Sequence, residues 1–229
     1  MKGARCPLFP ASYKLHTTVE VPVCAIPGTV LESLSMATAL GTPARILGID
    51  PGLDITGYGV VECRNADVRL VEAGLIRPAR RAGDGLPSRL RTLFNGVREV
   101  IREFEPRALC LEEVYSHASF PRTSILMGHA RGVICLAAEL EDIPVIDLSA
   151  KRIKKALTGN GNASKAQVQR AIQNTFSLVR FPQPPDVADA LAAAVCFIQH
   201  WQRSGNGERV GRRAPQVPRR AAKSGGTRE

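Results

Sequence analysis

The sequence lacks paired cysteines and long apolar runs, and it has few aromatic residues. None of the six cysteines belongs to a CxxC pair or to a Cys/His spacing typical of a zinc site. Cys110, Cys135 and Cys196 lie in apolar segments, which is typical of reduced core thiols in a cytoplasmic protein. No apolar run approaches the roughly 20 residues that cross a bilayer. We therefore expect a cytoplasmic globular protein without a zinc module, a disulfide framework or a membrane-embedded part.

Residues 1–44 lack any sustained helical or strand periodicity. Prolines at positions 7, 10, 22 and 27 interrupt this stretch, and it has no continuous apolar core of the kind a secretory signal requires. An organellar transit peptide is the alternative. We expect an N-terminal extension that is disordered, or a start codon assigned upstream of the true one at Met36.

Positive charge is concentrated at the C-terminus. The formal net charge is +10. Residues 203–229 carry eight basic and two acidic residues (+6), and residues 1–44 carry three and two (+1), which leaves +3 for residues 45–202. Because the tail is rich in Gly, Pro, Arg and Ser, we expect a basic disordered segment. The overall charge is therefore only weak support for nucleic-acid binding by the central region.

The central region, residues 45–202, has the periodicity of one α/β domain. Apolar residues alternate with turn signals or recur at helical spacing, and no internal repeat interrupts the order. The expected strands are 45–50, 59–63, 68–76, 108–114 and 145–148, and the expected helices are 86–104, 124–140, 149–157, 164–176 and 186–201. This order predicts a mixed five-stranded sheet with helices on both faces, in which the first three strands form an antiparallel meander.

Four acidic residues at the ends of apolar segments are the candidate site. Asp50 ends the first strand in ILGIDPG, where Pro51 and Gly52 turn the chain away. An Asp at this place can also brace the turn, and a similar motif holds phosphate in actin-like ATPases. If the fold brings Asp50 together with the acids of two other stretches, the carboxylates form an oxygen-rich site that suits magnesium or manganese.

The second acidic stretch, LCLEEVY, contains Glu112 and Glu113 at the end of the fourth strand. Strand side chains alternate between faces, so only one of the two can point to a shared site. Both faces of this strand are apolar, and periodicity leaves the choice open. Either residue can also be a solvated strand end.

The third stretch, PPDVADALAAAV, contains Asp186 and Asp189 at the start of an Ala-rich helix. Residues three apart on a helix lie on one face, so the two carboxylates are neighbours. The same pattern fits an N-cap with a capping-box acid. The positive end of the helix dipole lowers the cost of keeping both carboxylates ionised.

Basic and aromatic residues near these acids are candidates for DNA contact. Lys154 precedes a Gly-rich turn in SAKRIKKALTGNGNASKAQ, and Lys165 follows the turn, so the two could grip a phosphate backbone from two sides. Such a basic run is also typical of a solvated helix face. Tyr115 begins the loop YSHASFPRT, which could present an aromatic ring for stacking on an unpaired base or fold back as a lid.

Together these motifs resemble the RuvC family of Holliday-junction resolvases, which have an RNase H-like fold. The resemblance covers residues 46–199, roughly two-thirds of the chain. The shared motifs are ILGIDPG with TGYGV, LEEVY, GHARGV, IKKALTGNGNASKAQVQ and DVADALA, in the family's order. Leu53 and Asp54 replace a more polar or basic pair of the family, and the added acid Asp54 raises the question of whether it perturbs the site.

The resemblance implies roles for individual residues. It makes Asp50, Glu112, Asp186 and Asp189 the catalytic metal ligands, and it favours Glu112 over Glu113. It places Lys165 in both catalysis and DNA binding, with two further DNA-binding residues, Lys154 and Tyr115. The implied cofactor is Mg²⁺, two ions per active site, with Mn²⁺ as a substitute.

The resemblance further implies a magnesium-dependent endodeoxyribonuclease that nicks two opposed strands of a four-way junction in DNA recombination and repair. It implies a homodimer and the RuvA-RuvB branch-migration complex as a partner. For the dimer interface we expect the helix 124–140, including Ile125, Met127 and Val133, although these residues could equally be core. The alternatives are an RNase H-like nuclease acting on RNA–DNA hybrids, a non-catalytic junction-binding module and, least favoured, an actin-like ATP-binding protein.

Overall fold

The computed structural model describes residues 43–64, 67–78, 85–113 and 121–206. The expected N-terminal extension and most of the expected basic tail lie outside these residues. The domain boundaries drawn from the sequence stay a prediction. Within the described part, the first strand begins at Ala44 and the last helix continues to Asn206.

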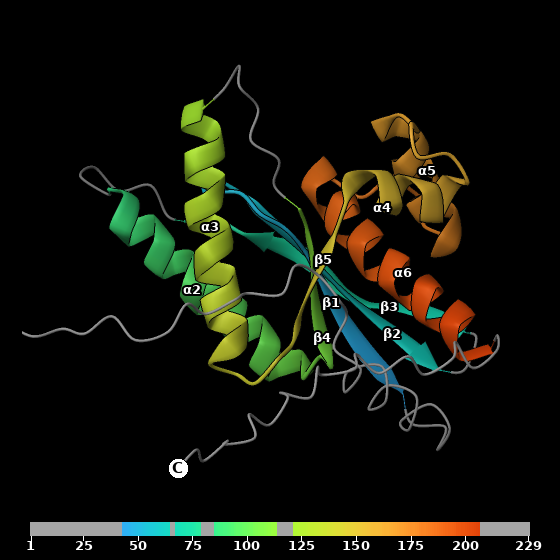
Figure 1. Ribbon diagram of the computed structural model, residues 1–229, viewed down its shortest axis with the longest axis horizontal. Coiled ribbons are helices and arrows are strands. Elements are labelled where there is room, and N and C mark those ends of the chain that lie inside the picture. The colour runs from blue at the N-terminus through green and yellow to red at the C-terminus, as the bar shows by residue number, and fades with distance from the viewer. Residues whose placement is uncertain (1–42, 65–66, 79–84, 114–120, 207–229) are drawn as a thin grey trace, which may run out of the picture.

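One mixed sheet of five strands forms the centre of the domain (Figure 1). The strands are β1 (Ala44–Asp50), β2 (Thr56–Arg64), β3 (Asp67–Ile76), β4 (Ala108–Glu112) and β5 (Val145–Leu148), in the spatial order β3-β2-β1-β4-β5. β1, β2 and β3 pair antiparallel, whereas β4 runs parallel to both β1 and β5. The predicted meander and the predicted mixed sheet are confirmed.

Helices cover both faces of the sheet, as predicted (Figure 1). One face carries α2 (Leu86–Phe104) and α3 (Pro121–Glu139), and the other carries α4 (Ala150–Thr158), α5 (Lys165–Thr175) and α6 (Pro185–Asn206). The observed ends differ from the predicted ones by a few residues. α3 begins and ends earlier than expected, and α6 extends beyond Trp201, because short polar or proline-containing ends carry little periodicity.

The helix α6 lies unusually close to the sheet because small residues face it. A Cβ atom added at Gly48 would lie 2.0 Å from the carbonyl oxygen of Ala190, and one added at Gly57 would lie 2.2 Å from that of Asp186. No side chain fits into either space. The backbone of α6 therefore rests directly on β1 and β2.

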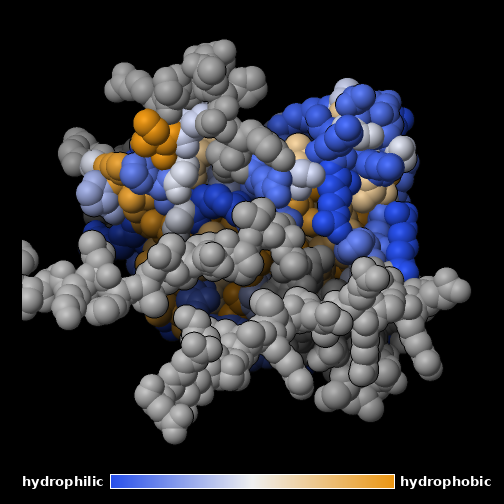
Figure 2. Space-filling view, in the orientation of Figure 1, coloured by the Kyte–Doolittle hydropathy of each residue, from blue (hydrophilic) through white to orange (hydrophobic). Residues whose placement is uncertain are grey.

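The outer face of α3 exposes large apolar side chains. Ile125, Leu136 and Leu140 are 60%, 52% and 55% exposed. Figure 2 shows hydrophobic side chains gathered on the side of the molecule where α2 and α3 lie, whereas the side of α4 and α5 is largely hydrophilic. Val133, which was also named for the interface, is partly buried and packs against the core between α3 and the sheet.

The described cysteines are free thiols that are buried or partly buried. Cys110 and Cys196 are buried free thiols, and Cys135 is a partly buried one. Burial raises the pKa of all three thiols, which keeps them in the unreactive protonated form. Among the described helices, none combines the length and the apolarity that a membrane crossing needs.

Candidate active site

The carboxyl ends of the two central parallel strands bring the first two acids to one edge of the sheet. Ile49 of β1 lies opposite Leu111 of β4, so the next residues, Asp50 and Glu112, leave the sheet side by side. Asp50 also pairs in register with Gly57 at the start of β2. This edge is where open sheets of this kind bind ligands.

The structure shows on which face of the sheet Glu112 lies. Cys110 belongs to the core beneath α4, α5 and α6, whereas Leu109 and Leu111 belong to the core beneath α2 and α3. Glu112 alternates with Leu111 and therefore lies on the α6 side of the sheet. Periodicity could not assign Glu112 to a face of the sheet, but the helices that cover each face do.

The first turn of α6 supplies the other two acids. α6 begins at Pro185, so Asp186 and Asp189 lie inside the helix, and Asp186 is not its N-cap. The missing side chain of Gly57 lets the backbone of Asp186 approach β2 next to Asp50. The capping-box alternative does not describe this geometry, because the Asp189 carboxylate pairs with a lysine of α5.

The electrostatics show that the four acids act on one another. Burial, together with the negative charges of Asp189, Asp186 and Glu112, raises the pKa of Asp50 to about 7 against the opposing effect of Lys165. Ionising Asp50 in the metal-free protein is therefore costly. Negative charge has accumulated at this edge beyond what the neighbouring cations neutralise.

Two lysines face the same acids. Glu112, Lys154, Lys165 and Asp189 line a cavity of about 210 Å³. Burial and the charge of Asp189 raise the pKa of Glu112, and both lysines lower it. The cavity therefore combines carboxylates with cations that could meet a phosphate.

Lys165 is held in place by the local structure at the start of α5. Ser164 and Gln167 form a capping box, in which each side chain bonds the backbone N–H of the other residue. The Lys165 Nζ atom lies 2.7 Å from Asp189 Oδ2. This ion pair raises the pKa of Lys165, so the lysine is a permanent cation inside the site.

The donor set suits a divalent cation, although the acids do not converge on one point. All four are carboxylates, the ligand type that Mg²⁺ and Mn²⁺ prefer, and the raised pKa of Asp50 reflects burial and charge repulsion, both of which a bound cation would offset. Nevertheless, no group of three or more His, Cys, Asp or Glu side chains in the described ranges is arranged to hold a metal ion. The charges of the acids affect one another, but in the described residues their side chains do not form a common metal-binding geometry.

Arg131 of α3 is a supporting residue that the sequence analysis did not identify. Its guanidinium donates a hydrogen bond of 3.0 Å to the carbonyl oxygen of Glu112 and forms an ion pair with Asp147 of β5. It thereby ties the end of β4 to β5 from the opposite face of the sheet. Its position within GHARGV, an otherwise mostly apolar stretch of helix, was the only trace of this role.

Two other residues were singled out from the sequence. Asp54 forms an ion pair with Arg89 of α2. Tyr115 lies outside the described residues.

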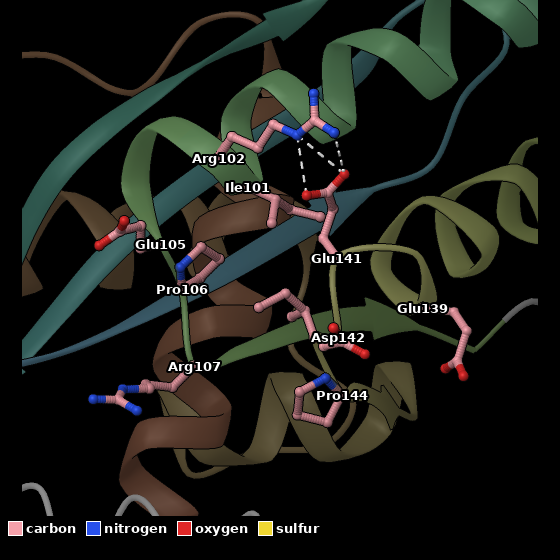
Figure 3. Close-up of a pocket in the computed structure, with 10 residues that line it drawn as sticks. Ile101, Arg102, Glu105, Pro106, Arg107, Glu139, Glu141, Asp142 and Pro144 are labelled. Carbon is pink, nitrogen blue, oxygen red and sulfur yellow. Dashed lines mark hydrogen bonds and ion pairs between the residues drawn. The ribbon is translucent and has the colours of Figure 1, made fainter.

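A larger cavity lies at the opposite edge of the sheet. Its volume is about 950 Å³, and Figure 3 shows it around Pro106 and Pro144, which precede β4 and β5. Two of the charged residues at its wall are engaged with each other, because Glu141 accepts hydrogen bonds from Arg102, and Glu141 also pairs with Arg98. Size alone would therefore have selected the wrong edge of the molecule.

Comparisons with known proteins identify the family of this chain. The family model described as Crossover junction endodeoxyribonuclease RuvC matches residues 46–197. Crossover junction endodeoxyribonuclease RuvC of Rhodopirellula baltica is 47% identical over 156 residues, which cover 68% of this chain and 86% of the relative. The protein of the same name from Azoarcus is 41% identical and covers 76% and 93% of the two chains.

A solved structure supports the same assignment. RuvC of Thermus thermophilus, solved in complex with a Holliday junction substrate, superposes with a TM-score of 0.65 at 28% identity, over 71% of this chain and 97% of that protein. The expected RNase H-like α/β fold is therefore confirmed. A matched family model over most of the domain, close relatives and a shared fold lead to one conclusion: the chain belongs to the RuvC family of crossover junction endodeoxyribonucleases.

Proposed function

We propose that this protein resolves four-way (Holliday) DNA junctions by metal-dependent nicking of two opposed strands during DNA recombination and repair. The observation that carries the proposal is the meeting of Asp50, Glu112 and Asp189 with two lysines at one edge of the sheet. A protein that only binds DNA has no reason to hold carboxylates beside phosphates, because like charges repel. Family membership identifies the substrate class.

We infer that Asp50, Glu112, Asp186 and Asp189 hold Mg²⁺, two ions per site, or Mn²⁺ in its place. Such ions acidify a water molecule and stabilise the leaving oxygen in phosphodiester hydrolysis. Because the ions would acidify the attacking water, none of the four carboxylates needs to act as a general base. Their contribution is to gather negative charge where burial makes that charge costly.

The two lysines bind and orient the DNA strand in this proposal. Lys165 projects from the capped start of α5 onto Asp189, and Lys154 of α4 lines the other side of the cavity. Their ammonium groups are placed to meet the non-bridging oxygens of the attacked phosphate. Lys165, being paired with a site carboxylate, is the lysine closer to the reaction.

Symmetric cutting requires two sites, and we propose a homodimer formed through the outer face of α3. Ile125 and Leu136 are exposed there, and Cβ atoms added at Gly128 and Gly132 would meet nothing within 4 Å. These four residues follow one another at helical spacing, so a second helix could approach closely. A Leu136→Asp variant should sediment as a monomer and lose paired nicks, whereas an unchanged dimer would exclude this interface.

Two further roles rest on the family resemblance. We propose that Tyr115 contacts unpaired bases at the crossover, and that the RuvA-RuvB complex is a partner. A Tyr115→Phe and Tyr115→Ala pair tests the first, because stacking depends on the ring and not on the hydroxyl. The expected result is normal cutting by the Phe variant and weak cutting by the Ala variant.

The test of the proposed function is to incubate the protein with a synthetic mobile four-way junction, with and without Mg²⁺, and to map cuts on all four strands. We expect paired symmetric nicks that require the metal. Asp50→Asn should abolish nicking and preserve junction binding. Cutting of RNA–DNA hybrids alone would replace the substrate, and binding without cuts in Mg²⁺ or Mn²⁺ would leave a non-catalytic junction-binding protein.

A further inference from the structure

The basic run that precedes the Gly-rich turn divides between two separate cavities. Lys154 faces the carboxylates, but Arg152 and Lys155 line a second cavity of about 400 Å³ on the other side of α4. His200 and Arg203 of α6 complete its basic wall. Four basic side chains from two helices thus surround one hollow outside the site described above.

The basic cluster consists of Arg152, Lys155, His200 and Arg203. Among the described residues, no carboxylate forms an ion pair with Arg152, Lys155 or Arg203, and no acidic residue lines the cavity. Burial lowers the pKa of His200, and the positive charges of Arg152 and Arg203 lower it further. Cations held this close without a counter-charge are typical of a site for an anionic ligand.

The cluster is continuous with the active site along one stripe of α6. Asp189 lines the catalytic cavity, and Cys196, His200 and Arg203 line the second one. These positions follow one another at helical spacing on one side of α6, and α4 borders both cavities. From Asp189 to His200 the helix rises about 16 Å, at roughly 1.5 Å per residue.

This separation fits the spacing of phosphates along DNA. With roughly 3.4 Å of helix axis between successive phosphates of one strand, about 16 Å corresponds to about five base pairs. Residues 207–229, which follow the cluster in the chain, carry seven basic and two acidic residues. Basic residues therefore also predominate in the part of the chain that follows the cluster.

We propose that Arg152, Lys155, His200 and Arg203 form a second phosphate-binding site, which holds a duplex arm of the junction about five base pairs from the cleaved bond. This inference rests on the proposed function and adds a place where an uncut arm is gripped. Its role is positioning, because the cluster lies too far from the carboxylates to touch the reacting phosphate. It also accounts for why only part of the basic run faces the acids.

The experiment compares a triple variant, Arg152→Gln with Lys155→Gln and Arg203→Gln, with a control of equal charge loss. The control replaces Arg91, Arg102 and Arg107 by Gln. These three arginines are exposed and lie in α2 or directly before β4. Junction affinity is measured against salt concentration for both. We expect the cluster variant to bind about tenfold or more weakly at 0.1 M salt, and its log–log salt slope to fall by about 2 to 3, since each lost phosphate contact removes about 0.9.

Arm length tests the position of the site. On junctions with arms of about four base pairs, the wild type and the cluster variant should bind alike, and the difference should return with arms of about twelve base pairs. A variant with Arg152→Lys and Arg203→Lys keeps the charge and should bind normally. Thermal unfolding of each variant separates lost contacts from lost folding.

The outcomes separate this inference from the proposed function. Wild-type protein that fails to bind or cut junctions contradicts the proposed function. Wild-type protein that cuts, together with a cluster variant that loses no more affinity than the control, overturns only the second site. Equal losses on short and long arms would also overturn it, as would an unchanged salt slope, the result expected if the cluster serves an acidic protein surface.

Discussion

The two helical layers of this domain treat their charges in opposite ways. In the α2–α3 layer, arginines are matched with acids: Arg98 and Arg102 with Glu141, and Arg89 with Asp54. In the α4–α6 layer, Lys165 pairs with Asp189, but the neighbouring carboxylates still raise the pKa of Asp50, and no ion pair is found for Arg152, Lys155 or Arg203 among the described residues. Matched charges stabilise the fold, whereas a cluster of like charges favours binding of a ligand with the opposite charge.

The comparison also explains why the larger cavity is not the candidate site. In the cavity beside Glu141, the carboxylate of Glu141 is paired with Arg102 (Figure 3). In the cavity of about 210 Å³ beside Asp189, burial and the charge of Asp189 raise the pKa of Glu112, although Lys154 and Lys165 lower it. The perturbed carboxylates, and not the cavity volume, distinguish the candidate site.

The first prediction compares one acid from each layer. Asp189→Asn should reduce metal-dependent nicking by at least about 100-fold, because a metal ligand contributes several kcal/mol to transition-state stabilisation. Glu141→Gln, an equally conservative change, should leave nicking within about twofold, since its partners are structural. Single-turnover nicking of a synthetic junction measures both. Similar losses in the two variants would erase the distinction between the layers.

The second prediction concerns the stability of the metal-free protein. The pKa of Asp50 is raised from its ordinary value of 3.8 to about 7, so the folded state holds a proton that the unfolded state releases between these values. The stabilisation is fully present below about pH 4 and is lost as the pH rises toward 7. Unfolding by urea in EDTA should therefore show a loss on the order of 2 to 4 kcal/mol across this range from Asp50.

Asp50→Asn is the matched variant for this measurement. It removes the ionisable group and should flatten the pH dependence, so that the variant is more stable than the wild type at pH 8 without metal. Added Mg²⁺ should stabilise the wild type more than the variant. If the free energy of unfolding changed with pH by the same amount in the wild type and in Asp50→Asn between pH 5 and pH 8, the raised pKa of Asp50 would be contradicted.

The third prediction tests how α6 is seated. Gly57→Ala should destabilise the protein by about 1 to 3 kcal/mol, because its Cβ would collide with the carbonyl oxygen of Asp186. Nicking should fall as well, since α6 supplies two of the acids. The control is Gly85→Ser at the start of α2, where the nearest atom to an added Cβ is 3.6 Å away. This control should lose neither stability nor activity, since serine is a good N-cap.

The smallest effect is expected where charges are matched at the surface. Arg102→Gln removes one of the two partners of Glu141, and Arg98 keeps the other contact, 2.6 Å long. The urea midpoint and the nicking rate should both stay within experimental error of the wild type. A clear loss of activity would mean that the α2–α3 layer takes part in the reaction.

Much of the fold was predictable because the sequence alternates clearly between strand and helix periods. All five strands and five helices of the described residues match predicted ones, with shifts of a few residues at their ends. The positions of Asp50, Asp186 and Asp189 at element ends were equally clear. Their proximity followed from the family resemblance and was then found in the structure.

The remaining features depend on contacts between distant segments. Periodicity could not separate Glu112 from Glu113, because β4 is buried on both faces and the deciding fact is which helices cover which face. Arg131 acts through a contact that crosses from α3 to the end of β4. The division of one basic run between two cavities requires the rotation of α4 relative to α6.

The size pattern on the central strands has a consequence for folding. Towards α6, β1 and β4 present small residues, Gly48, Ala108 and Cys110, and towards α2 and α3 β4 presents Leu109 and Leu111. A one-residue slip of β4 would turn the leucines toward α6 and keep that helix away from the sheet. The acids of α6 would then never reach those of the strands. We therefore expect α6 to dock, and to bring its acids to those of the strands, only when β4 pairs in the observed register.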